Sequence, residues 1–330
     1  MELIKVSPFA KDLIALSFLK GLGKSTILKI LKKSPPLDDL FSYVLKNQTK
    51  KNYSIDEINV AYEKARYQID LAKKYGHSII SYLDDVYPES LRTTFDAPVF
   101  LFCNGDLDLL SRPSVTIIGT RSPTPHGEII TKRITDWAVM SDWTITSGLA
   151  KGIDTIAHKQ CLSSKGQTIS VMAQGLNKVY PAENKTLAGE IVAKGGLLIS
   201  EYTYDSFVGK SNFVERDRIQ AGLSKAVFLI QSGLKGGSLH ASKAILKYER
   251  YLFVVGQSKS DILENTENIQ ANLLLLGNND FDKANLLNTT LEQNKNIIKF
   301  NNKKLYPKAI NLINSFSFNK QRKNSSYEMF

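Results

Sequence analysis

The chain has 330 residues, of which 42% are hydrophobic and 23% are charged. This length predicts two domains, and the apolar fraction excludes a wholly disordered chain. The 43 Lys and Arg residues outnumber the 32 Asp and Glu residues, and the net charge of +11 favours a polyanionic partner. Two cysteines, Cys103 and Cys161, are too few for a disulfide framework.

No apolar run approaches the roughly 18 residues that are needed to cross a bilayer. Charges at Lys5, Lys11 and Asp12 interrupt the segment that would be the apolar core of a signal peptide. We therefore expect a cytoplasmic protein without a membrane partner.

The first 76 residues are predicted to form a helical domain of the helix-hairpin-helix or SAM-like type. Apolar residues at helical spacing flank the turn Gly21-Leu22-Gly23, and glycines in such a hairpin let the backbone approach a DNA phosphate. The alternative is a hairpin that only packs within the domain. A second helical stretch begins at Ser54, which has capping-box spacing to Glu57, and ends at Gly76.

Residues 77–112 are predicted to be a strand-and-turn lead-in, with extended pieces at 79–82 and 99–102. From residue 113 to 295, short continuous apolar runs alternate with segments long enough for helices, which predicts a parallel sheet covered on both faces. The fold class is therefore α/β, with a Rossmann-like sheet. The predicted strands are 115–118, 144–146, 168–172, 197–200, 226–230 and 252–255, and the predicted helices are 126–140, 152–164, 184–194, 212–224 and 238–249.

Residues 296–330 are predicted to be a basic, flexible tail. Between Lys299 and Lys323 there are seven basic residues and no acidic one. Such a tail can attract nucleic acid, or it can simply be a solvated end of the chain.

The turns after the first two central strands carry small and cationic residues that suit a phosphate. The first is Gly119-Thr120-Arg121, followed by Thr124 as a helix cap and Pro125 in the first helical turn. The second runs from Ser147 through Gly148, Lys151 and Gly152 to Asp154. Neither turn matches a Walker P-loop or Gly-x-Gly-x-x-Gly, so ATP hydrolysis is not indicated.

Asp154 and His158 are four residues apart and share a helix face. They can form a metal or acid/base pair, but no third ligand is evident, and a capping or packing role is the alternative. The four histidines, at positions 77, 126, 158 and 240, show no metal spacing, so we expect no metal and no other cofactor.

A third group surrounds the start of the predicted helix near residue 212. Lys210, Phe213, Arg216 and Arg218 combine an aromatic ring with cations, a mixture that suits single-stranded nucleic acid. Phe213 can alternatively be a hydrophobic anchor of the helix. Asn212 and Glu215 stand in capping-box register. The fourth turn, Lys235-Gly236-Gly237-Ser238, offers another glycine approach, with Ser238 as a helix cap.

Together these residues resemble the DNA-processing protein A family (DprA, also called Smf). The resemblance runs over about 170 residues. Its motifs are Tyr87-Pro88 with Leu91, Asp96 and Pro98; Ile118-Gly119-Thr120-Arg121; Ser147 to Asp154 with Ala157-His158; Val179-Tyr180-Pro181 with Glu183-Asn184; Ser200-Glu201-Tyr202; Asn212-Phe213, Arg216, Arg218 and Ala221 to Ser224; and Gly237-Ser238-Leu239.

The resemblance implies a homodimer that binds single-stranded DNA without sequence preference, protects incoming strands during natural transformation and loads the RecA recombinase onto them. It implies no catalysis. By position, the DNA-binding residues would be Arg121, Lys151, Lys210, Phe213, Arg216 and Arg218. The turn residues that let phosphates approach would be Gly119, Thr120, Ser147, Gly148, Gly152, Gly237 and Ser238.

The sequence also departs from the family pattern. Asp217 stands where the family usually has Asn, and Glu215 where a basic residue is common, so the local potential is weakened. Val255-Gly256 replaces an expected Pro-Gly pair, and no C-terminal winged helix is evident.

The alternative function is a Rossmann-like nucleotide sensor or a nucleotide N-glycosidase. Glu201, which follows a predicted strand, would then be the candidate acid. The other interpretation of Glu201 is a structural carboxylate.

Overall fold

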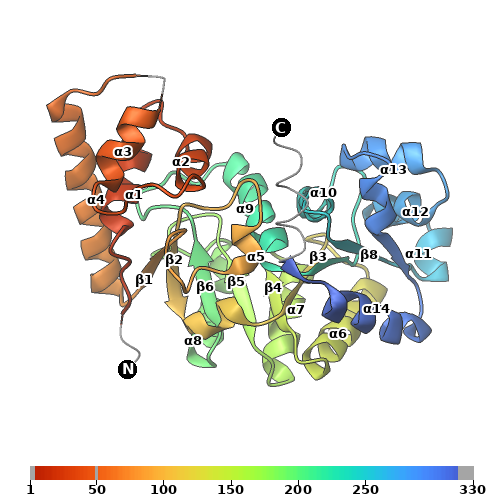
Figure 1. Cartoon of the computed structure of the whole chain (residues 1–330). Helices are drawn as coiled ribbons and strands as arrows, with labels where there is room; N and C mark the ends of the chain where they lie inside the picture. The colour runs from red at the N-terminus through yellow and green to blue at the C-terminus, as the bar shows by residue number, and fades with distance from the viewer. Residues whose placement is uncertain (1–3, 49–50, 319–330) are drawn as a thin grey trace.

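One mixed β-sheet runs through the molecule in the computed structural model, which describes residues 4–48 and 51–318 (Figure 1). Its strands are β1 (Ser78–Ser81), β2 (Phe100–Gly105), β3 (Ser114–Ile118), β4 (Thr144–Ser147), β5 (Thr168–Val171), β6 (Leu197–Ser200), β7 (Ala226–Leu229), β8 (Tyr251–Val255) and β9 (Ile297–Phe300). Their order in the sheet is β1-β2-β6-β5-β4-β3-β7-β8-β9. From β6 to β9 in that order the strands are parallel, whereas β2 is antiparallel to both of its neighbours.

The six apolar runs of the central region form β3 to β8, each within one residue of the predicted bounds. Alternate side chains of one strand enter different clusters: Ala226 and Phe228 pack on one face of the sheet, and Val227 and Leu229 on the other. Since both faces are buried, β7 and β8 are apolar at successive positions rather than at every second position, whereas β3, β4 and β5 also bury Ser and Thr side chains. The predicted α/β Rossmann-like fold is confirmed, and β1 and β2 extend it on one side.

Helices cover both faces of the central strands (Figure 1). On one face lie α6 (Pro125–Met140), α7 (Ile153–Ser163) and α14 (Tyr306–Ser315), and on the other α9 (Lys210–Leu223), α10 (Leu239–Lys247), α12 (Gln270–Leu276) and α13 (Asp280–Leu287). The remaining α-helices of the described central and C-terminal residues are α5 (Glu89–Arg92), α8 (Lys185–Ala193) and α11 (Lys259–Leu263). The predicted crossover helices are thus present, each within two residues of its expected bounds.

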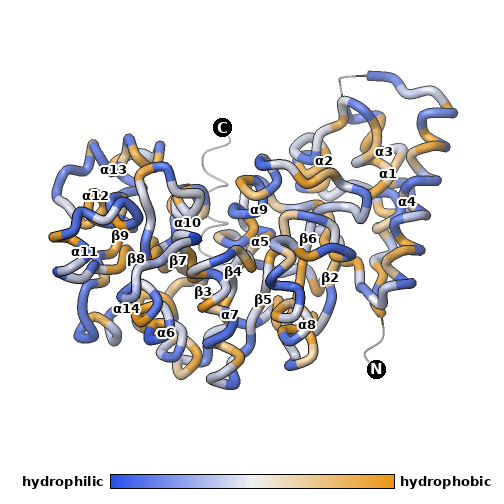
Figure 2. The backbone as a smooth tube through the Cα atoms, turned by 180° about the vertical axis from the view of Figure 1, so that it is seen from behind, coloured by the Kyte–Doolittle hydropathy of each residue, from blue (hydrophilic) through white to orange (hydrophobic). Residues whose placement is uncertain are grey.

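The N-terminal helical region consists of α1 (Ala10–Phe18), α2 (Lys24–Leu31), α3 (Leu40–Asn47) and α4 (Ile55–Tyr75). Gly21, with φ +93°, makes the turn between α1 and α2. Ser54 and Glu57 form the predicted capping box, and Gly76 ends α4 in the left-handed conformation. In Figure 2, α4 alternates between hydrophobic and hydrophilic residues along its length, as expected for a helix with one packed face.

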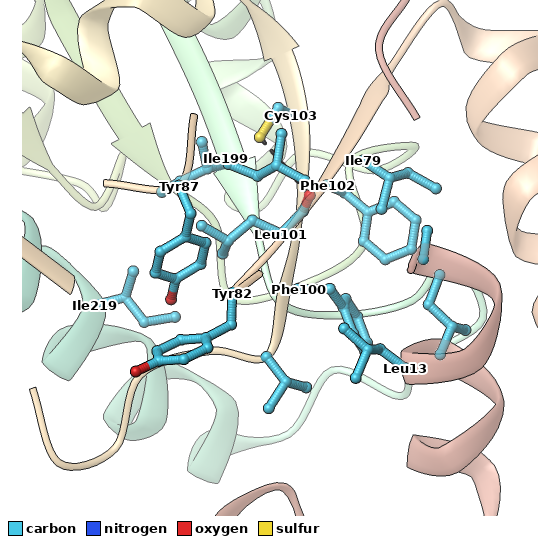
Figure 3. Packing of buried hydrophobic residues seen from close by; sticks show 14 of the residues in the cluster. Leu13, Ile79, Tyr82, Tyr87, Phe100, Leu101, Phe102, Cys103, Ile199 and Ile219 are labelled. Carbon is cyan, nitrogen blue, oxygen red and sulfur yellow. Dashed lines mark hydrogen bonds between the residues drawn. The ribbon is translucent and has the colours of Figure 1, made fainter. Parts of the chain in front are cut away.

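The helical region and the sheet share one buried hydrophobic cluster. Leu13 of α1 lies beside Phe100 of β2, and the cluster continues through Phe102 and Ile79 to Ile199 of β6 and Ile219 of α9 (Figure 3). This cluster joins side chains from before and after residue 76, so the core shows no break there. The domain boundary that we expect at residue 76 stays a prediction.

The predicted flexible tail from residue 296 is wrong over its described part. Strand β9 pairs in parallel with β8, and α14 buries Ala309 and Ile313 against the sheet beside Phe300. The many Lys and Asn residues of this segment mask an apolar pattern that begins at Ile297. Residues 319–330 of the predicted tail lie outside the described residues.

The strand order places a topological switch point at β3. The chain moves from β3 to β4 on one side, and β7 pairs with β3 on the other side. In open α/β sheets, a crevice for ligands forms at the carboxyl ends of the strands where the winding reverses. The turns after β3 and β7 therefore border the expected binding site.

Arg250 ties the lead-in segment to the central sheet. Its side chain is fully buried, and one guanidinium nitrogen donates to the carbonyl oxygens of Gly222 (2.7 Å) and Ser224 (2.9 Å). The other terminal nitrogen donates to the Ser90 carbonyl (2.6 Å) and the Thr93 hydroxyl (3.1 Å). Burial lowers the pKa of Arg250 to about 9, so the cation is retained at neutral pH.

We predict that Arg250→Met lowers the free energy of unfolding by on the order of 3 kcal/mol, because several buried carbonyl groups lose their donor. Urea denaturation of wild type and variant measures this difference. Arg66→Met, at an exposed position of α4, is the matched control and should leave the stability nearly unchanged. Equal destabilisation by both variants would contradict the role assigned to Arg250.

Candidate nucleic-acid interface

A cavity of about 390 Å³ lies at the switch point, between the turn after β3, the turn after β7 and helix α9. It is lined from the β3 side by Gly119, Thr120 and Arg121, from the β7 side by Ser232, Lys235, Gly236, Gly237 and Ser238, and from α9 by Phe213, Arg216, Asp217 and Gln220. Most residues that we predicted from separate turns therefore meet at one cavity.

The turn after β3 leads into α6 as predicted. The Thr124 hydroxyl accepts from the Gly127 amide (3.1 Å), and Pro125 occupies the first turn. Arg121 is exposed, and its guanidinium lies 5.8 Å from the centre of the Phe213 ring. A Cβ at Gly119 would come within 2.6 Å of the Ile153 side chain, so packing of α7 against this turn explains the glycine.

Hydrogen bonds of two buried side chains, Asp154 and Ser147, hold the turn after β4 in place. Asp154 accepts from the backbone amides of Gly148 (3.1 Å) and Ala150 (3.3 Å), and the Ser147 hydroxyl donates to the Ile117 carbonyl (2.7 Å). Burial raises the pKa of Asp154, while the Arg216 charge and the backbone donors favour its ionised form. Asp154 therefore has the structural role of the predicted capping-or-packing alternative: it holds this turn and does not cap α7, whose N-cap Gly152 has no side-chain cap.

His158 does not form a pair with Asp154. It is fully buried, and its Nδ1 lies 2.7 Å from the Thr168 hydroxyl. Burial lowers the pKa of His158 to about 3, so the ring is neutral. Among residues 4–48 and 51–318, no group of three His, Cys, Asp or Glu side chains could hold a metal ion.

Gly152 allows the turns after β3 and β4 to touch. It has φ +74°, and a Cβ there would come within 2.6 Å of the Arg121 carbonyl carbon. The neighbouring Ile153 amide donates to the Thr120 carbonyl (3.2 Å). This close approach brings Lys151, in the turn after β4, to the same edge of the sheet as Arg121, in the turn after β3.

Arg216 lies at the cavity but is buried, with only 4% of its surface exposed. Its guanidinium donates to the carbonyl oxygens of Gly148 and of Val171, the latter at 2.7 Å. Its Nε donates to Asp217 (3.0 Å). A Cβ at Gly148 would collide with this guanidinium, so the glycine makes room for the arginine.

Asp217 completes this buried group. Its carboxylate also accepts from the Gln220 amide (2.8 Å). Burial raises the pKa of Asp217 to about 7, a shift that Arg216 opposes and the Asp154 charge reinforces. The carboxylate therefore titrates near neutral pH.

Two aromatic rings and two cations gather beside the main cavity. The rings of Tyr180 and Phe213 lie 5.3 Å apart at 56°, and Arg121 and Lys151 line the same small hollow. Lys151 also pairs with Glu183 (2.5 Å), and both side chains are largely exposed. We did not predict Tyr180 as a site residue, although its place in the Val179-Tyr180-Pro181 motif could have identified it.

Lys210 and Arg218 lie apart from the cavity. Lys210 is exposed at the first position of α9. Arg218 donates to both carboxylate oxygens of Glu201 (2.7 and 2.8 Å) and to the Asp96 carbonyl (2.7 Å). Lys24 of α2 reaches the same carboxylate at 3.2 Å. Glu201 is thus a buried structural carboxylate that accepts from side chains.

Two predicted caps are corrected. Helix α9 begins at Lys210 with Gly209 as its N-cap, so Asn212 and Glu215 form no capping box; Glu215 instead accepts from the Tyr202 hydroxyl (3.0 Å). Ser238 precedes α10, but its hydroxyl donates to Ser232 (2.9 Å) rather than capping the helix.

The raised pKa of Asp217 predicts a pH-dependent stability. An unfolded aspartate has a pKa of about 4, so between about pH 4 and 7 the native state keeps a proton that the unfolded chain has released. The free energy of unfolding therefore decreases as pH rises through this window. Asp217→Asn cannot ionise, so its stability relative to wild type should increase between about pH 5 and 8 in urea denaturation. A relative stability that decreases over that range would contradict the raised pKa.

No helix among the described residues is long and apolar enough to span a membrane.

Comparison with known proteins gives consistent matches. The family model described as DNA recombination-mediator protein A matches residues 78–275. The DNA processing protein DprA of Bacillus subtilis (strain 168) is 34% identical over 244 residues, which cover 73% of this chain and 82% of that protein. Protein Smf of Synechocystis is 40% identical over 179 residues, 53% of this chain and 45% of the relative, so this match spans about half of its length.

Two solved structures are similar over most of their own length. DprA from Streptococcus pneumoniae has a TM-score of 0.61 at 28% identity, covering 82% of this chain and 98% of that one. A Helicobacter pylori DprA, whose structure was described for its single-stranded DNA binding mode, has a TM-score of 0.53 at 33% identity, covering 66% and 96%. The chain therefore belongs to the DNA recombination-mediator protein A family of DNA-processing proteins, whose relatives are named DprA and Smf.

Proposed function

We propose that this protein binds single-stranded DNA without sequence preference and does so at the rim formed by the turns after β3 and β4 and by α9. The observation that carries the proposal is the pair of rings, Tyr180 and Phe213, beside Arg121 and Lys151. Tyr180 is 51% exposed, so its ring is accessible. Every base has a face that can stack on an aromatic ring, and cations can follow the phosphates of any sequence.

The charge distribution supports a polyanionic ligand. Residues 113–260 contain 18 basic and 11 acidic side chains, so the central region holds most of the net charge of +11. Arg121 and Lys151 lie exposed at the rim, where they can neutralise phosphates. The single-stranded DNA binding mode described for the Helicobacter pylori relative agrees with this ligand class.

The cationic residues divide into two roles in this proposal. Arg121, Lys151 and Lys210 are exposed and would contact phosphates directly. Arg216 and Arg218 are engaged by backbone carbonyls and carboxylates, and we assign them the positioning of α9. Phe213, three residues before Arg216, would receive a base.

The test is fluorescence anisotropy with labelled oligo-dT at several salt concentrations. Affinity should fall with salt, and Arg121→Ala should lower both the affinity and the salt slope, the latter by roughly 0.7 for one lost phosphate contact. Phe213→Ala should weaken binding about tenfold while leaving the slope unchanged, because stacking releases no counterions. Lys132→Ala, exposed on α6, is the matched charge control. Salt-insensitive binding, or equal affinity for duplex DNA, would contradict the proposal.

A nucleotide sensor is the second candidate, and the switch-point cavity of about 390 Å³ is the observation that favours it. Thermal shift with a panel of nucleotides and with oligo-dT separates the two functions, since a ligand stabilises only the fold that binds it. Stabilisation by a mononucleotide alone would favour the sensor. The N-glycosidase variant of this candidate is disfavoured because Arg218 and Lys24 occupy the Glu201 carboxylate.

We further propose a homodimer that loads RecA onto the bound strand, as the family resemblance implies. Leu263 of α11 is 85% exposed and Phe281 of α13 is 69% exposed, and these helices lie at one end of the molecule (Figure 1). Exposed apolar side chains of this kind suit a contact between copies.

Sedimentation equilibrium should show dimers of the wild type and monomers of Leu263→Asp, because a buried unpaired charge opposes association. RecA filament formation on single strands should be faster with the wild type than without it. A monomeric wild type would contradict the dimer, and an unchanged filament rate would contradict RecA loading.

A further inference from the structure

Phe207 is an aromatic side chain in the loop between β6 and α9 that the proposed interface does not use. It is 86% exposed, whereas Tyr202 and Tyr204 of the same loop are buried. The two buried rings anchor the loop on the protein, and the third ring, that of Phe207, faces solvent.

The chain around Phe207 is held by hydrogen bonds although its ring is not packed in the core. The Asn212 side-chain amide donates to the Phe207 carbonyl (3.0 Å), and the hydroxyl groups of Thr203 and Ser206 lie 2.8 Å apart. The ring lies beside Gly209, where a Cβ would be 3.4 Å from the ring edge. These contacts hold the backbone that carries the ring. Binding of a ligand that stacks on the ring would therefore cost little conformational entropy of the loop.

The helical region anchors the other end of this loop. Gln68 of α4 is fully buried and uses both ends of its amide: it accepts from the Tyr204 backbone amide and donates to Asp205, each at 2.8 Å. The His77 ring lies 3.0 Å from the Tyr204 hydroxyl. Because Gln68 engages Asp205, the acidic group nearest to Phe207 in the sequence already has a partner.

Phe207 is also close in the chain to two of the proposed DNA-binding residues, Lys210 and Phe213. Helix α9 begins at Lys210, and Lys210 and Phe213 are three residues apart, so they share one face of the helix. Phe207 precedes Lys210 by three residues. A strand that leaves the Phe213 ring along the start of α9 would pass the Lys210 ammonium group and then the Phe207 ring.

We propose that Phe207 is a second stacking platform, which takes a nucleobase of the same single strand beyond the one bound at Phe213. This inference rests on the proposed function. A nucleobase suits the site better than a protein partner, because Phe207 is a single exposed ring beside the half-buried Val208, and the other neighbours in the chain are Ser206, Gly209, Lys210 and Ser211 rather than a broad apolar patch.

The experiment compares wild type, Phe207→Ala and Phe207→Trp on oligo-dT from about 4 to about 16 nucleotides, the span of typical single-strand sites. Phe207→Ala should bind long oligonucleotides about tenfold more weakly, while its affinity for the shortest should equal that of wild type. Phe207→Trp should keep full affinity, and its emission should be quenched by long oligonucleotides only. Met140→Ala, at an 87% exposed position at the end of α6, is the matched control for loss of an exposed apolar side chain.

Three results would overturn the inference while leaving single-stranded DNA binding intact: equal affinity of Phe207→Ala and wild type at every length, an equal loss at every length, or a tryptophan emission at position 207 that saturating oligo-dT leaves unchanged. An equal loss would place Phe207 in the support of the Phe213 site rather than beyond it. If the wild type binds no oligonucleotide, the proposed function fails as well.

Discussion

The burial of the Arg216 guanidinium is the constraint on which the proposed interface depends. A buried cation is costly unless it is paired or hydrogen-bonded, and the Arg216 guanidinium donates to Asp217 and to the carbonyl oxygens of Gly148 and Val171. Gly148 and Val171 lie at the carboxyl ends of β4 and β5, so the arginine fixes α9 across the strand ends. Phe213 precedes Arg216 by three residues on the same helix and is thereby placed beside the turn after β3.

The two arginines near Phe213 have different roles, because Arg216 is buried and Arg121 is exposed. Arg216 donates hydrogen bonds to two backbone carbonyl oxygens and to Asp217, whereas the Arg121 side chain is exposed and lies over the Phe213 ring. Gly152 lets the two turns approach closely and so adds Lys151 to the rim. The buried Arg216 therefore fixes the position of α9. The exposed Arg121 and Lys151 supply the positive electrostatic potential that would attract a flexible polyanion.

The sequence was informative where local chemistry decides the outcome. Continuous apolar runs gave the strands because a sheet covered on both faces needs no polar position, and Thr124 caps its helix as expected. Tertiary contacts decided the rest. Asn212 and Glu215 have capping-box spacing, yet α9 starts earlier, at Lys210. The spacing of Arg216 and Arg218 says nothing about burial, because the carbonyl oxygens of Gly148 and Val171 and the carboxylate of Glu201, which hold them, come from other parts of the chain. The Lys-rich and Asn-rich composition around residue 300 concealed β9, whose strand character depends on pairing with β8.

The helix-hairpin-helix turn illustrates how a long-range contact chooses between two local interpretations. Its glycines suit a phosphate, but the adjacent Lys24 places its ammonium group 3.2 Å from Glu201 and 5.0 Å from the centre of the Tyr202 ring. Burial opposes ionisation of Glu201, yet Arg218 and Lys24 together hold its pKa below the usual value, so the carboxylate stays charged and keeps both partners. For Lys24 to bind DNA, a buried carboxylate would have to give up one of these cations, which is costly. The packing interpretation of the hairpin is therefore favoured, and the lysine instead joins the helical region to the loop that leads into α9.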